Sequence, residues 1–180
     1  MKFVLIAFVG GWAGVAFGQG VASEWDVRTM VSNLETQEQH LKPLLDQLKP
    51  DGWVANGAPQ TYVTQWRSTE TELKYLMQNS EAFMKQPEKL TLALDTYFRM
   101  QSINSMLGSI SEAVRKYQNP AVAELVQSAA NETATNADKL RDYIRQLAQQ
   151  KEEEFQVADR EAQKCRASLL KQTPMERKSK

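Results

Sequence analysis

Residues 121–173 contain neither glycine nor proline, the two residues that most often interrupt a helix. Apolar side chains recur through this stretch every three or four residues, which is the spacing of one face of an α-helix. Such a helix would be about 75 Å long at 1.5 Å per residue. Weak helix formers cluster at residues 131–136, where a break would be easiest, but no residue there forbids a helix. We therefore expect one continuous or slightly bent helix.

A helix is also predicted over residues 23–49, because Val27, Leu34, Leu41 and Leu48 are seven residues apart. A seven-residue recurrence is typical of helical bundles and coiled coils. Pro43 lies inside this pattern, and its ring removes one backbone hydrogen bond and crowds the preceding turn. We expect a kink or break at residues 39–42, close to Gln37 and Glu38, where the apolar pattern is weakest.

Two further helices are predicted between the prolines at positions 59, 87 and 120. The first carries Tyr62, Trp66, Leu73, Leu76, Met77, Phe83 and Met84, and the second carries Ala93, Tyr97, Met100, Ile103, Leu107, Ile110, Val114 and Tyr117. Residues 49–59 contain the turn pairs Asp51-Gly52 and Asn56-Gly57 and are predicted to form the longest loop. Short connections favour antiparallel neighbours. The predicted fold is all-α, an elongated antiparallel bundle of about four long helices, the last of which is longest and overhangs.

The N-terminal residues resemble an export signal. Lys2 precedes an apolar run over residues 3–17, which ends in small residues, with Ala16 and Gly18 at the −3 and −1 positions of a cleavage site. The run is shorter than the roughly 20 residues that a membrane-spanning helix needs. We expect a signal peptide at residues 1–18, a helical bundle domain at 19–172, a disordered tail at 173–180, and a periplasmic or secreted protein with no membrane span after cleavage.

Charge is balanced in the chain. Of 22 basic and 22 acidic side chains, cleavage would remove only Lys2, which leaves 21 against 22. Nucleic-acid binders usually present a basic face to the phosphates, so we expect no nucleic-acid partner.

Histidine is the residue whose scarcity excludes the most chemistry, because His40 is the only one. The chain contains no pair of Glu-x-x-His motifs, no His-Glu-x-x-His motif and no Cys-x-x-Cys-His motif. We therefore expect no catalytic residue, no metal and no cofactor. His40 is predicted to be a solvated surface residue. The alternative is an axial ligand to a b-type haem, paired with Met77, Met84 or Met100.

Candidate partner contacts are Trp53, Trp66, Tyr62 and Cys165. Tyr62 and Trp66 are one helical turn apart and share a face, whereas Trp53 falls in the predicted loop, where it either packs over the bundle or contacts a partner. Cys165 lies on the apolar stripe with Ala158, Ala162 and Leu169. It is predicted to be a small buried side chain, with an intermolecular disulfide between parallel helices and a free exposed thiol as alternatives.

These observations predict an exported, non-enzymatic helical-bundle protein that acts through protein contacts, as a scaffold, an adaptor or a holdase-like binder. A homodimer through the C-terminal helix is one arrangement to consider. The alternative function is a bundle that carries a hydrophobic ligand or b-type haem. A helical enzyme that uses Cys165 or the carboxylates around Glu152 comes third.

Overall fold

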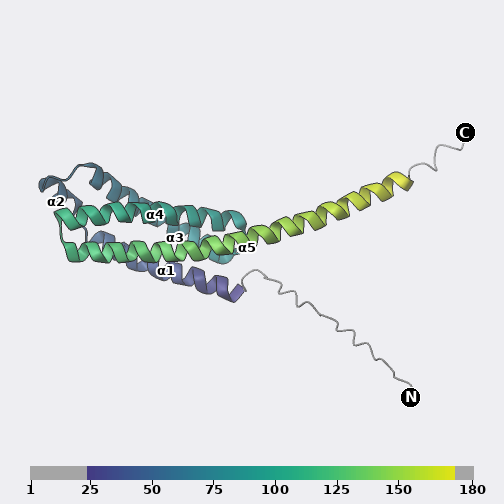
Figure 1. Ribbon diagram of the computed structural model, residues 1–180, viewed down its shortest axis with the longest axis horizontal. Coiled ribbons are helices and arrows are strands. Elements are labelled where there is room, and N and C mark those ends of the chain that lie inside the picture. The colour runs from purple at the N-terminus through teal and green to yellow at the C-terminus, as the bar shows by residue number, and fades with distance from the viewer. Residues whose placement is uncertain (1–23, 173–180) are drawn as a thin grey trace, which may run out of the picture.

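The computed structural model describes residues 24–172, all of which belong to helices or to the short connections between them (Figure 1). The helices are α1 (Glu24–Asp46), α2 (Pro50–Ala55), α3 (Thr61–Lys85), α4 (Leu90–Tyr117) and α5 (Pro120–Gln172). No strand occurs within this range. The predicted all-α bundle is confirmed, with four long helices and the short α2 in addition.

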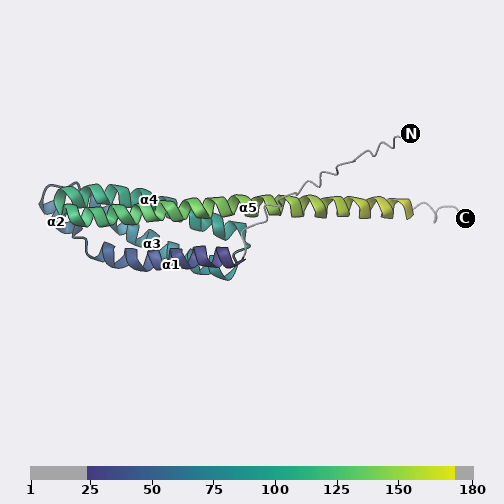
Figure 2. The same ribbon diagram turned by 60° about the horizontal axis from the view of Figure 1, so that its bottom comes forward.

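The four long helices run up and down beside one another. α1 contacts α3 and α5, and α4 contacts the same two helices, so α1 and α4 lie on opposite corners of the bundle. Four residues join α3 to α4 and two residues join α4 to α5, so each helix reverses the direction of the one before it. The start of α1 therefore lies at the end of the bundle from which α5 leaves (Figures 1 and 2).

Local chemistry sets the start of α5. The side-chain Oδ1 of Asn119 accepts a 2.7 Å hydrogen bond from the backbone N–H of Ala121, and Pro120 occupies the first helical position. The backbone N–H groups of Gln118 and Asn119 both donate to the carbonyl of Val114, which closes the last turn of α4. This two-residue turn brings α4 and α5 together along their length.

A continuous apolar core fills the space between the long helices. Phe83, Met100, Ile103, Leu107 and Ile110 are fully buried. Each such side chain contributes roughly 1.5–3 kcal/mol of transfer free energy, which exceeds the differences in helix propensity among residues other than proline. A cavity of about 10 Å³ near Met30 and Asn136 has room for about one water molecule.

α1 differs from its prediction. The helix runs through Pro43 without a break and ends at Asp46 rather than at Lys49. The predicted break is therefore wrong, while a bend without a break stays untested. Pro43 is exposed, so water can satisfy the carbonyl group that loses its helical donor.

The predicted loop over residues 49–59 is wrong in part, because it contains α2. Pro50 begins this helix at a position where a missing N–H costs nothing, and Asp51 adds an acidic side chain to the first turn. Gly57 has a φ of 89°, a conformation that glycine adopts without strain, and it ends the turn that leads to α3. α2 thereby covers the end of the bundle opposite the exit of α5 (Figure 1).

α5 is one continuous helix of 53 residues, as predicted, and it leaves the bundle (Figures 1 and 2). Leu147 is the last buried residue, and every residue from 152 to 171 is exposed. We call residues 152–172 the projecting segment; it extends about 30 Å at 1.5 Å per residue. The predicted signal peptide and tail lie outside the described residues. None of the helices in the described range is both long and apolar enough to traverse a bilayer.

Candidate functional site

The projecting segment carries apolar side chains that no other part of the described chain covers. Phe155 is 72% exposed and Leu169 is 59% exposed, and Ala158, Ala162 and Cys165 between them are also exposed. We call these five residues the seam. Exposed apolar side chains that stand alone are common, but these five form one contiguous stripe, so the seam is a candidate contact surface.

The seam is the direct continuation of the core-facing side of α5. At 100° per residue, its five side chains lie within an arc of about 80° around the helix axis. Leu140, Ile144 and Leu147 fall within the same arc, and they are buried against the bundle. The face that α1 and α4 cover inside the bundle is therefore uncovered beyond residue 151.

Charged side chains surround the seam and remain in solvent. Lys151 pairs with Glu154 at 2.9 Å and Lys164 pairs with Glu161 at 2.8 Å, both within one helical turn. The hydrogen bond and charge of Lys151 lower the pKa of Glu154. Glu154 and Glu161 are therefore solvated partners in local ion pairs. Such exposed pairs contribute little to stability, so they keep the segment in solution without fixing its contacts.

Cys165 is exposed and unpaired within the described chain. The prediction of a buried side chain is wrong. The neighbouring helices α1 and α4 reach along α5 only about as far as Leu147, so nothing in the described chain covers Cys165. Cys165 does continue the apolar spacing of α5, but spacing alone does not reveal how far the neighbouring helices extend.

Trp53, Trp66 and Tyr62 lie in α2 and in the first turns of α3, toward the same end of the bundle. Trp53 is only 1% exposed, and its indole Nε1 donates a 2.9 Å hydrogen bond to Oε1 of Gln118. Trp66 donates through Nε1 to the carbonyl of Leu45 at 3.1 Å, and the Tyr62 and Tyr117 rings lie 6.3 Å apart. These contacts make the three aromatic residues part of the packing. Trp53 leaves almost no surface for a partner.

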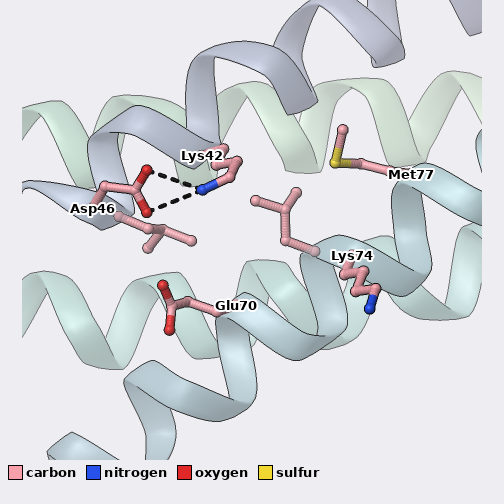
Figure 3. A pocket seen from close by; sticks show the side chains of 7 residues that line it. Lys42, Asp46, Glu70, Lys74 and Met77 are labelled. Carbon is pink, nitrogen blue, oxygen red and sulfur yellow. Dashed lines mark hydrogen bonds and ion pairs between the residues drawn. The ribbon is translucent and has the colours of Figure 1, made fainter.

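A groove of about 320 Å³ lies between α1 and α3 (Figure 3). Leu45, Leu73 and Met77 provide its apolar lining. At one rim, Nζ of Lys42 binds the Asp46 carboxylate at 3.0 Å, and Glu70 of α3 lies across from this pair. Burial and the neighbouring Asp46 raise the pKa of Glu70. The groove reaches the lower end of the size range of small-molecule sites.

Two polar side chains of α1 reach into the interior of the bundle. Oε1 of Glu38 accepts a 2.6 Å hydrogen bond from the Ser80 hydroxyl, and both residues are buried. Gln37 donates through Nε2 to Oγ1 of Thr133 at 2.5 Å and accepts from Nδ2 of Asn136 at 2.7 Å. We call these five residues the polar layer. Burial raises the pKa of Glu38 to about 7, although the bond from Ser80 opposes this shift.

The sequence prediction missed the polar layer. Gln37 and Glu38 appeared as a weak point in the apolar pattern, whereas they are buried at 4% and 2% exposure. A signal was present, because Thr133 and Asn136 interrupt the apolar pattern of the last helix in the same way. Polar residues at matching depths of two seams can satisfy one another.

His40 is exposed, as predicted. An axial haem ligand would have to face the core, where Met100 is fully buried on α4, the helix diagonal to α1. Within residues 24–172, no group of three or more His, Cys, Asp or Glu side chains is arranged to hold a metal ion.

The chain shows no significant match to any protein-family model, curated protein or solved structure.

Proposed function

We propose that this protein is exported and acts without catalysis, by binding a protein partner along the projecting segment of α5. It would serve as a scaffold, an adaptor or a holdase-like binder. The observation that carries the proposal is the seam, which continues the buried face of α5 into solvent for about four turns at 3.6 residues per turn. An apolar helical face of this kind is completed by another helix, either in a groove or in a coiled coil.

The state of the carboxyl groups supports a role other than catalysis. Glu38 is the carboxyl group whose pKa is raised most among the described residues. It is buried and bound to Ser80, so a substrate has no access to it. In the projecting segment, Glu154 and Glu161 are exposed and paired with lysines of the same helix. A catalytic carboxyl group is normally held in a cleft that also admits the substrate.

The proposal of export depends on Lys2 and the apolar residues 3–17 in the sequence. Cell fractionation followed by N-terminal sequencing tests it. We expect the protein outside the cytoplasm with Gln19 as its first residue. Recovery of a cytoplasmic protein that still begins at Met1 would contradict export but would leave the binding proposal intact.

Site-specific photo-crosslinking tests the contact surface. A photoreactive amino acid at Ala158 or Ala162 would lie on the seam, and the same amino acid at Ala167 would lie on the opposite face of the same exposed helix. Irradiation in native cells should give discrete protein adducts from the two seam positions and few from position 167. Equal labelling at all three positions, or none, would show that the seam is not a contact surface.

A second function is favoured by one observation, the groove between α1 and α3. Its apolar lining and charged rim suit a small amphipathic molecule, and its volume fits a short acyl chain better than a haem. Titration with medium-chain fatty acids tests this function. We expect saturable binding that Met77→Glu, at a partly exposed lining residue, abolishes and that Ala167→Glu does not change.

A further inference from the structure

The side-chain sizes and flanking charges of the seam favour one particular partner. We propose that it binds the seam of a second copy of this chain, with the two helices antiparallel and Ala162 opposite Cys165 of the second copy. This inference rests on the proposed function, because it names the partner of the same surface. Three observations support this inference: the sizes of the seam residues, the charges that flank the seam, and the position of the bundle relative to the projecting segment.

The sizes of the seam residues fit an antiparallel pair. Small side chains, Ala158, Ala162 and Cys165, occupy the middle of the seam, and the large Phe155 and Leu169 occupy its ends. With Ala162 opposite Cys165 of the second copy, each Leu169 lies opposite the small Ala158 of the second copy, while Phe155 lies opposite residue 172, beyond the end of the seam. A parallel pair would instead place Leu169 against Leu169 and Ala158 against Ala158. Alternation of large and small residues is what allows two helices to interdigitate.

The charges beside the seam also distinguish the two orientations. Asp159 and Arg166 flank the seam on the same side, and neither forms an ion pair within residues 24–172. In the antiparallel pair, each Asp159 approaches Arg166 of the second copy, which gives two attractive contacts. In a parallel pair, Glu154 approaches Asp159 of the second copy, and this repulsion offsets the attraction between Glu161 and Arg166. Flanking charges of this kind set the orientation of coiled coils.

The bundle favours the same orientation. The seam shares its face with Leu140, Ile144 and Leu147, which α1 and α4 cover. A parallel second helix would continue along this face toward residue 140 and would meet those helices. An antiparallel helix reaches its own residue 172 opposite Phe155, which is two turns beyond Leu147. The two bundles would then lie at opposite ends of the paired helices.

Sedimentation analysis of the full chain and of the chain that begins at Gln19 tests self-association. We expect dimers from both. Ala162→Glu should lower the association constant by about tenfold or more, because it places an unpaired charge in the contact. Ala167→Glu, on the opposite face, is the matched control and should leave the association constant unchanged. Circular dichroism should show the same helix content in both variants.

Charge reversal tests the orientation. Asp159→Arg should weaken an antiparallel dimer, because it brings two arginines together, and addition of Arg166→Asp should restore the dimer. In a parallel dimer, Asp159→Arg would instead strengthen association by removing the repulsion from Glu154. Stronger association of Asp159→Arg would therefore overturn the antiparallel arrangement.

Disulfide trapping gives a second test of orientation. A variant with Ala162→Cys and Cys165→Ala is mixed with a tagged wild-type chain and oxidised. The antiparallel pair should form cross-links between the two different chains, because position 162 faces position 165. A parallel pair would form cross-links only between identical chains. Monomers at all concentrations would overturn the inference, and photo-crosslinks from the seam to another protein would then leave the proposed function standing.

Discussion

Ser80 of α3 donates a 2.6 Å hydrogen bond to Glu38 of α1, and both side chains are buried where the two helices meet. A carboxylate at this depth loses most of its hydration, and a single hydroxyl donor does not replace it. Burial therefore raises the pKa of Glu38 from 4.5 to about 7, with a smaller contribution from the charge of Glu35. We therefore expect the packing of α1 against α3 to depend on pH.

The free energy of unfolding should fall as the pH rises from 4.5 to 7. The pKa of Glu38 is higher in the folded protein than in the unfolded chain, so deprotonation favours unfolding over this window. The contribution of Glu38 is fully present below pH 4.5 and is lost above about pH 7. The loss amounts to about 3 kcal/mol, at roughly 1.4 kcal/mol per pH unit. Urea denaturation at pH 5 and pH 8 measures it.

Glu38→Gln is the control for this pH dependence. Glutamine keeps an acceptor for the Ser80 hydroxyl but carries no charge at any pH, so the variant should match the wild type at pH 5 and exceed its stability at pH 8. The difference between the two proteins isolates Glu38 from every other titrating group. Parallel stability curves for both proteins would contradict a raised pKa.

The fold was predictable from the sequence because apolar spacing directly encodes which side of a helix is buried. Leu107 and Ile110 were assigned to the core from their spacing alone, and both are fully buried. The length of α5 followed from the absence of glycine and proline. Apolar spacing and the absence of glycine and proline are properties of one stretch of sequence, so they can be recognised without knowing what the helix packs against.

The candidate site was only partly predictable, because burial depends on what the rest of the chain covers. Cys165 and Leu147 occupy equivalent positions on one stripe, yet only Leu147 has neighbouring helices beside it. Trp53 is the opposite case, since turn chemistry predicted a loop while Gln118, 65 residues further along the chain, accepts its indole hydrogen bond. Contacts between distant segments decided both outcomes.

Trp53→Ala should destabilise the fold by about 3–5 kcal/mol, as expected when a large aromatic side chain is removed from a core. Trp53→Phe should cost less, because it keeps most of the apolar surface and loses only the hydrogen bond to Gln118. Thermal unfolding followed by circular dichroism measures both. An alanine variant as stable as the wild type would show that Trp53 is not a core residue.

The polar layer predicts coupling between Gln37 and Asn136. Gln37→Leu leaves the buried amide of Asn136 without its acceptor and should cost about 1–3 kcal/mol. In the double variant Gln37→Leu/Asn136→Leu, no such amide remains, so the total cost should be smaller than the sum of the two single variants. A double-mutant cycle in urea measures this coupling, and strictly additive costs would mean that the two amides act independently.

Leu107→Ala and Glu153→Ala separate the core from the projecting segment. Leu107 is fully buried on α4, so its truncation leaves a cavity and should cost about 2–5 kcal/mol. Glu153 is exposed and its Oε1 accepts only a 3.2 Å hydrogen bond from Gln149, so its removal should change the stability by less than about 0.5 kcal/mol. Chemical denaturation of the two variants side by side measures the difference. Equal and small effects would mean that α4 turns a different face toward its neighbours. Because α5 packs on α4, the buried face of α5, which continues as the seam, would then also be assigned wrongly.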